Sequence, residues 1–510
     1  MGATTVVALS LIIGLTVALW QAGVARQERD RADEQRARAE RRFSDVRQLS
    51  NALLTDIAPK IERLEGSIEA RQALVIQSLK YLDSLAQESG TDLQLHGELA
   101  AAYEQVGDLQ GAPRKPNLSD FPGAISSYEK AKKIRRGMLE RSPADFEYRK
   151  SLAANLTALA TIRQWMSNVG PPLEDYAEAI TIYDRLLAER PESVGLRLAA
   201  SEARLGLANT HYFNDQIAAI YPLLRSALAT LETLKQTDPE HVETRRLLGR
   251  GYTLLGMTLY WDGKQKEGEA EMMKAVAITE SLVGQYPHDT FLKQGLLSTY
   301  LQAWQLYQDT DHARAFDILR VALRVALESV AGDRANTQAR HNLAKTYSAL
   351  GLVAILQKKP GEAIPYLEKS SAEYTELERI DPKNRNYKQD IGRVLLYLGQ
   401  TQFQRRNWDD ALATYTKAAA LFEEDLRTDP NNNYPLRKLA NVYTYIGDTH
   451  LDASRATTGQ TRQTHVRAGK ESHQRALDIL MQLQSRNAFT EKDHKHVEEV
   501  RAALRYYEQQ

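Results

Sequence analysis

The sequence predicts an all-α fold, a solenoid of repeated helix hairpins, and two observations carry this prediction. Prolines and small residues recur about every 48 residues along the chain, and apolar residues within each unit follow the spacing of a helix face. The composition agrees with this fold, because 510 residues contain only 16 prolines and 28 glycines.

The composition also excludes several classes of function. Basic and acidic residues are equal in number, 66 of each, so the chain lacks the basic field of a nucleic-acid-binding protein. It contains no cysteine, which excludes disulfide bonds, cysteine-ligated metals and thiol catalysis. Hydrophobic residues make up 43% of the chain and charged residues 26%, which are ordinary proportions for a folded protein.

The segment 1–25 stands apart, because it has no charged side chain. Val6 to Trp20 is almost continuously apolar, which is long enough to span a bilayer and long for the core of a signal peptide. Residues 1–25 are therefore predicted to be a transmembrane anchor, and a signal sequence is the alternative. Seven arginines from Arg26 to Arg42 favour, by the positive-inside rule, a cytoplasmic location for the following residues.

Residues 26–55 are predicted to form a polar stalk helix. Apolar residues recur there at every seventh position, but Glu28, Gln35 and Arg42 occupy the other seam positions, so a single solvated helix is favoured over a coiled coil. A pair of helices within residues 43–91 is expected to cap the N-terminal end of the repeats.

The period itself is the strongest signal in the sequence. Six prolines follow it, and the first four and the last two are spaced by the same interval: Pro143, Pro191, Pro239, Pro287, Pro382 and Pro430. A second position recurs with a spacing of 47 or 48 residues, and in all but one unit it holds a residue with a small side chain. Its residues are Ala160, Ala208, Gly256, Trp304, Gly351, Gly399 and Gly447. Apolar residues lie four and one positions before it, on one face of a helix.

Each unit is therefore predicted to be a helix–turn–helix hairpin that buries its apolar face only by stacking on its neighbours. Eight such units are predicted over residues 92–488, of which the eighth carries a polar insertion at 454–469. Residues 489–510 are expected to form a helix that caps the C-terminal end.

The spacing of the small residue and of the positions +12, +16 and +19 relative to it resembles the tetratricopeptide repeat, whose usual period is about 34 residues. This resemblance implies a right-handed superhelix with a concave groove lined by the first helix of each hairpin. The 24 tyrosines lie mostly at repeat anchor positions and are interpreted as packing residues.

A narrower resemblance covers residues 41–141. The runs 42–47, 81–86 and 102–108 are similar to the region after the membrane span in bacterial transmembrane serine/threonine kinases with C-terminal tetratricopeptide arrays. That similarity implies an extracytoplasmic, periplasmic location for the repeats, against the arginine count, and the cytoplasmic location stays open. The given residues contain no kinase motif, so kinase activity is not implied.

No catalytic, cofactor-binding or metal-binding residue is predicted, because nucleophile elbows, phosphate-binding loops and HExxH spacings are all absent. The tetratricopeptide resemblance instead implies groove residues six before, one after and four after the small residue. These are Arg250, Lys345, Arg393 and Asn441 at the first position, Asn209, Gln305 and Gln400 at the second, and Tyr212, Tyr260 and Phe403 at the third. Cations, amides and aromatic rings suit an extended peptide that is acidic or ends in a free carboxylate.

The sequence thus predicts a non-enzymatic, membrane-anchored scaffold for protein–protein interaction, a sensor or regulatory module of a signalling system. Two alternatives stay open. One is a non-catalytic remnant or fragment of a serine/threonine kinase whose catalytic domain is on another chain. The other is a secreted repeat protein of envelope assembly.

Expressed as the full chain, the protein should sediment with membranes and resist extraction by high salt, because its apolar run is long enough to span a bilayer. Fractionation of expressing cells measures this, and a chain lacking residues 1–25 serves as the control. Recovery of most of the uncut full chain in the soluble fraction would contradict the prediction.

Overall fold

The computed structural model describes residues 68–508, apart from 89–91, 113–117, 119, 167–169, 214–215, 333, 335, 381, 383–384 and 487. The described residues form helices, turns and loops and no strand, which confirms the all-α fold. The predicted anchor at 1–25, the stalk at 26–55 and the first part of the cap at 43–91 lie outside the described residues. The chain divides into two compact units, Met1–Lys80 and Tyr81–Gln510.

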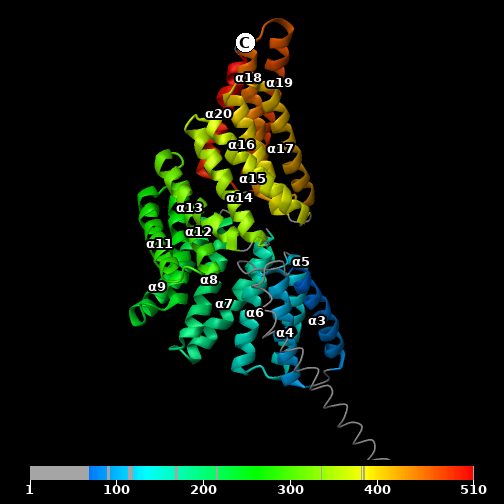
Figure 1. Ribbon diagram of the computed structural model, residues 1–510, viewed down its shortest axis with the longest axis vertical. Coiled ribbons are helices and arrows are strands. Elements are labelled where there is room, and N and C mark those ends of the chain that lie inside the picture. Colours follow the sequence, from blue (N-terminus) through cyan, green and yellow to red (C-terminus); the bar gives the residue numbers. More distant parts are fainter. Residues whose placement is uncertain are drawn as a thin grey trace, which may run out of the picture. The chain divides into compact units, whose positions relative to one another are not determined.

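Eight helical hairpins follow one another along the described residues of the second unit (Figure 1). They are α4 (Leu93–Gly111) with α5 (Phe121–Arg141), α6 (Phe146–Trp165) with α7 (Gly170–Glu189), α8 (Val194–Phe213) with α9 (Ile217–Thr237), α10 (Val242–Trp261) with α11 (Gln265–Gln285), α12 (Thr290–Ala303) and the short 3₁₀ helix η2 (Trp304–Leu306) with α13 (His312–Gly332), α14 (Thr337–Leu356) with α15 (Pro360–Ile380), α16 (Arg385–Gln404) with α17 (Trp408–Thr428), and α18 (Asn433–Ala456) with α19 (Gly459–Ser485). Helix α3 (Ile68–Glu88) precedes them and α20 (Glu491–Glu508) follows.

Short polar side chains start many of the first helices. Five of the eight begin after an aspartate or asparagine whose side chain accepts hydrogen bonds from backbone N–H groups of the first turn: Asp92, Asp145, Asp289, Asn336 and Asn432. These caps satisfy backbone donors that have no partner inside the helix.

From α4 onward each helix packs against the next one along the chain, and the first helices of successive hairpins also contact one another from α6 to α18. Second helices of successive hairpins do not pack together to the same extent in the described part of the chain. The hairpins are therefore most closely spaced on the side lined by their first helices. We call this side the inner face.

The small residue of each first helix lies where the second helix approaches most closely. A methyl group on Gly399 would lie 2.5 Å from the ring of Tyr415, and one on Gly351 would lie 2.6 Å from Leu367. Both partners stand at position +16 relative to the glycine, on the facing helix. The small residue therefore sets the distance between the two helices of a hairpin.

The fifth hairpin shows what happens when this residue is large. Trp304 stands at the small-residue position, and the first helix α12 ends one residue earlier after only 14 residues. The chain continues as η2, which places Trp304 in a buried cluster with Met272 and Tyr307. An indole ring does not fit between two closely packed helices, so the first helix stops and the ring fills the core instead.

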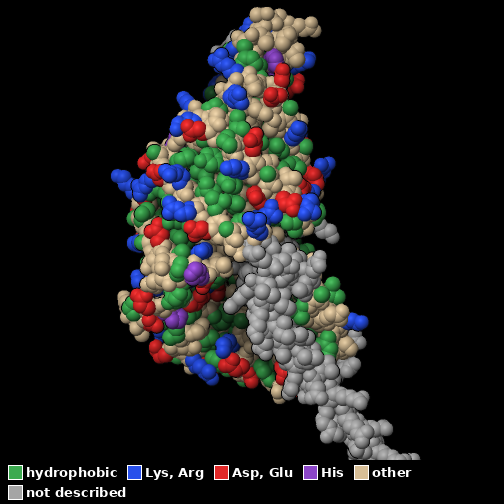
Figure 2. Space-filling model, in the orientation of Figure 1, with side chains coloured by type: hydrophobic (Ala, Val, Ile, Leu, Met, Phe, Trp, Pro, Cys, Tyr) green, Lys and Arg blue, Asp and Glu red, His purple; other side chains and the backbone are tan. Residues whose placement is uncertain are grey.

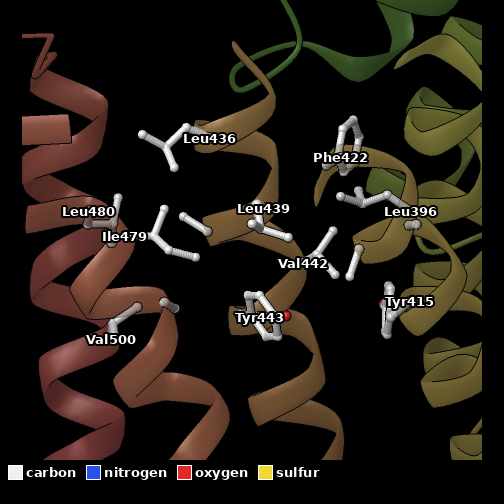
Figure 3. Close-up of a cluster of buried hydrophobic side chains, with 14 of the residues drawn as sticks. Leu396, Tyr415, Phe422, Leu436, Leu439, Val442, Tyr443, Ile479, Leu480 and Val500 are labelled. Carbon is white, nitrogen blue, oxygen red and sulfur yellow. The ribbon is translucent and has the colours of Figure 1, made fainter. Parts of the chain in front are cut away.

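Apolar side chains from adjacent hairpins form continuous clusters, of which the C-terminal one is drawn in Figure 3. Leu396 of α16, Tyr415 of α17 and Val442 of α18 meet in it. Leu480 of α19 and Val500 of α20 extend it, so α20 covers the apolar face of the last hairpin. On the surface, acidic and basic side chains are interspersed over the face shown in Figure 2.

Among the described residues, one helix, α9, is long and apolar enough to cross a membrane by length and composition. Its side chains Ile220, Leu224 and Leu231 lie in a buried cluster with Leu247 and Leu248 of α10. The apolar composition of α9 is therefore used in packing the third hairpin against the fourth.

Replacing Gly399 by alanine should lower the free energy of unfolding by about 1–3 kcal/mol, because the added methyl group collides with the buried Tyr415 ring. The matched control is Gly295→Ala on α12, where a methyl group meets no atom within 4 Å. That change should leave stability unchanged or raise it by up to about 1 kcal/mol. Urea denaturation of both variants measures the difference, and equal midpoints would contradict the packing account.

Candidate functional site

The ten predicted groove residues all lie on first helices or in η2. They are Asn209 and Tyr212 on α8, Arg250 and Tyr260 on α10, Gln305 in η2, Lys345 on α14, Arg393, Gln400 and Phe403 on α16, and Asn441 on α18. Every one of them is half-buried, neither core nor fully solvent-exposed. This exposure is that of side chains partly covered by the neighbouring first helix.

Two of the predicted cations meet at a buried carboxylate between α14 and α16. Asp390, only 5% exposed, accepts a hydrogen bond from His341 Nε2 at 2.6 Å and pairs with Arg393 at 2.6 Å. Lys345 stands one turn after His341 on α14; the charge of Asp390 acts on it, but it makes no direct hydrogen bond or ion pair within 4 Å among the described residues. We call His341, Lys345, Asp390 and Arg393 the Asp390 cluster.

The protonation states in the Asp390 cluster follow from burial and from its two cations. Burial lowers the pKa of His341 to about 4, and the charge of Lys345 acts in the same direction, so this ring is neutral at pH 7. Burial would raise the pKa of Asp390, but Arg393, Lys345 and His341 together hold it well below the ordinary value. Two positive charges and one negative charge leave the cluster with a net charge of about +1.

Tyrosine hydroxyls lie around this cluster. The Arg393 guanidinium donates to the hydroxyl of Tyr374, on α15, at 3.5 Å. Tyr397 on α16 and Tyr434 on α18 are half-buried and close enough to the Arg393 charge to interact with it. Burial raises the pKa of Tyr397, and that of Tyr434 to about 12, so both hydroxyls keep their proton at neutral pH and can donate hydrogen bonds.

Two of the three predicted aromatic residues, Tyr212 and Tyr260, lie at the C-terminal ends of α8 and α10. Trp261 Nε1 donates to the hydroxyl of Tyr212 at 2.7 Å, and the Tyr260 hydroxyl donates to Asp309 at 3.1 Å. Phe213, beside Tyr212 in an edge-to-face contact, is 70% exposed. These rings therefore form a group separate from the Asp390 cluster.

Other predicted residues differ in whether the polar groups of their side chains already have a partner within the protein. Arg250 lies 3.8 Å from Glu202, and Gln305 donates to the Leu301 carbonyl on the preceding turn. Gln400 is different, because its buried Oε1 atom has no hydrogen-bond partner among the described residues. Phe403 packs against the C-terminal apolar cluster.

His341, Asp390 and the contacts between them were not predicted from the sequence. The signal that could have found them is a separation of one repeat plus one residue, which brings together facing positions on successive first helices or in the turn just after them. Four side-chain contacts show it: His341 to Asp390, Trp261 to Tyr212, Tyr260 to Asp309, and Gln404 to the carbonyl of Ile355.

A second periodic contact was also missed, because the tyrosines were interpreted as packing residues. The tyrosine four positions before the small residue donates its hydroxyl proton to a carboxylate 20 residues earlier, on the preceding helix: Tyr103 to Asp83, Tyr252 to Glu232, Tyr300 to Glu280 and Tyr443 to Glu423. These tyrosines therefore join the first helix of a hairpin to the helix before it by a charge-assisted hydrogen bond as well as by packing.

Comparison with known proteins gives one family match. A tetratricopeptide repeat model matches residues 393–424, which cover most of the seventh hairpin and include Arg393, Gln400 and Phe403. Together with the helical hairpins, this match supports a tetratricopeptide repeat protein. No curated protein sequence is significantly similar to the chain.

Several solved structures resemble the chain at low identity. A Rap protein complexed with competence and sporulation factor is 12% identical, with 76% of this chain and 98% of that chain covered and a TM-score of 0.43. A thermophilic tetratricopeptide protein of Thermus thermophilus is 17% identical, with 48% and 99% covered and a TM-score of 0.30. The human IFIT1 dimer with m7Gppp-AAAA is 13% identical, with 81% and 90% covered and a TM-score of 0.32.

The folded protein should lose stability as the pH falls from about 6.5 to 4, partly through His341. Its pKa is about 4 in the folded chain and about 6.5 when unfolded, so the unfolded state binds more protons in this range. The stability is therefore present above pH 6.5 and is lost on acidification. In the variant His341→Gln this part of the loss, roughly 3 kcal/mol, should be missing. Urea midpoints from pH 4 to 7 measure it, and parallel curves for both proteins would contradict the assignment.

Proposed function

We propose that the repeats bind an extended segment of a partner protein on their inner face, at an anion site formed by Lys345 and Arg393. The observation that carries the proposal is the state of Lys345, a half-buried cation beside Arg393 without an ion-pair partner among the described residues. Burial lowers the pKa of this lysine, which reflects the cost of removing its charge from water. A carboxylate of the partner would offset that cost.

The net charge of the Asp390 cluster favours a single carboxylate over a doubly charged group. Asp390 already neutralises one of the two cations, since it pairs with Arg393 at 2.6 Å. One incoming negative charge makes the cluster neutral, whereas a phosphate dianion would leave an excess negative charge in a half-buried place. The hydroxyls of Tyr397 and Tyr434 can supply neutral donors to the same group.

Gln400 extends the site along α16. It lies two helical turns after Arg393 on the same face, which is a distance of about 10 Å. Its Oε1 is a buried acceptor with no hydrogen-bond partner among the described residues. A rotation of the Gln400 side chain would present this acceptor to a backbone N–H of a peptide whose carboxylate meets Lys345.

The N-terminal segment is proposed to hold this scaffold at a membrane. Residues 1–25 have the length and composition of a span, and residues 41–141 resemble the region after the span of bacterial transmembrane serine/threonine kinases with C-terminal tetratricopeptide arrays. These features support an extracytoplasmic sensor or regulatory module of a signalling system, which binds proteins and carries out no chemistry itself.

Replacing Lys345 by glutamine should weaken binding of a carboxylate-bearing peptide by tenfold or more, because charge-assisted contacts are worth roughly 1.5–3 kcal/mol. The melting temperature should stay the same or rise, since the change removes an unpaired half-buried charge. Binders are first selected with the full chain in detergent micelles from peptides ending in a carboxylate, and fluorescence anisotropy then gives the affinities.

The matched control is Lys417→Gln, an exposed lysine on the second helix α17. It should bind peptide like the original chain. Arg393 is a less clean test, because reversing its charge would place a second carboxylate beside Asp390 and lower stability. Equal affinities of the Lys345 and Lys417 variants, or the absence of any binder among the peptides ending in a carboxylate, would contradict the proposed site.

A further inference from the structure

The eighth hairpin brings two histidines of different helices into direct contact. His450 on α18 and His465 on α19 face each other with their Nδ1 atoms 2.9 Å apart and their ring centroids 5.2 Å apart. His465 belongs to the polar insertion at 454–469, which lengthens α18 to 24 residues and α19 to 27. Both rings are half-buried, so one side of the pair is open to solvent.

The distance between the two nitrogens fits joint coordination of one metal ion. Imidazole nitrogens bind zinc at about 2.0–2.1 Å, so two of them at angles of about 90–110° around the ion are roughly 2.9–3.4 Å apart. The observed 2.9 Å lies at the short end of this range. A small rotation of both rings therefore turns their Nδ1 lone pairs toward a common point outside the hydrogen bond.

Coordination at this pair needs no net loss of a proton. In the hydrogen-bonded pair one ring carries its proton on Nδ1 and the other ring accepts it. Transfer of that proton through water to Nε2 of the same ring leaves both Nδ1 atoms free and both rings neutral. Neutral imidazoles are the form that binds metal.

We propose that His450 and His465 form a binding site for a divalent transition-metal ion of the zinc, nickel and copper class, which clasps α18 to α19. No group of three or more histidine, aspartate or glutamate side chains in the described part of the chain is arranged to hold a metal ion, so water completes the coordination shell. A pair of imidazoles selects nitrogen-binding ions in the order Cu²⁺ above Ni²⁺ and Zn²⁺, and does not retain Mg²⁺ or Ca²⁺.

Calorimetric titration of the untagged full chain in detergent with Zn²⁺ and Ni²⁺ at pH 7.5 tests the site. One saturable site per chain is expected, together with a clear rise in melting temperature at tenfold excess of metal and no response to Mg²⁺. His465→Gln should lose at least tenfold in affinity and lose the rise in melting temperature. His288→Gln, at an exposed position between α11 and α12, is the matched control and should keep both.

The electron paramagnetic resonance spectrum of Cu²⁺ on the unmodified chain tests the same site independently of whether a variant folds. The expected spectrum shows coupling to two imidazole nitrogens, reduced to at most one in His450→Gln. Absence of saturable binding, binding unchanged in His465→Gln, or a copper spectrum without nitrogen coupling would overturn the proposal.

Discussion

The close approach of two helices at one small residue is the constraint from which the rest of the structure follows. At Gly399 and Gly351 a single methyl group would collide with the facing helix, so the distance between the helices of a hairpin is set there. That distance fixes which side chains meet one repeat plus one residue apart on adjacent first helices. Where the small residue is replaced by Trp304, the first helix stops after 14 residues, which shows how directly the constraint acts.

The Asp390 cluster is a product of this register. His341 and Asp390 lie 49 residues apart on successive first helices and meet at 2.6 Å, which leaves Arg393 and Lys345 beside one carboxylate. One cation is paired and the other has no partner in the described part of the chain, so the cluster retains an unmatched charge in a half-buried place. Keeping such a charge half-buried costs free energy in the free protein, and a bound anion would offset that cost. The Asp390 cluster, which arises from helix packing, can in this way serve in binding.

The period predicted the helices well because it is made of local signals: apolar residues spaced along one helix face, and prolines that end helices. The ten residues expected on the inner side all lie on first helices or in η2, since their positions count from the small residue. Their environments could not be predicted in the same way. Arg250, Lys345 and Arg393 share one position in their repeats, yet Arg250 lies near Glu202 and Arg393 pairs with Asp390, while Lys345 has no such partner among the described residues. These differences depend on non-repeating residues, Glu202 of the preceding hairpin and Asp390 of α16 itself, which no period encodes.

A double-mutant cycle between the protein and a bound peptide tests the central claim, that Lys345 on the inner face binds a carboxylate. The cycle combines Lys345→Gln with replacement of the peptide's terminal carboxylate by an amide and measures all four affinities. The account predicts that amidation weakens binding to the original chain by tenfold or more and hardly affects binding to Lys345→Gln. Losses that simply add, with no coupling between the two changes, would contradict it.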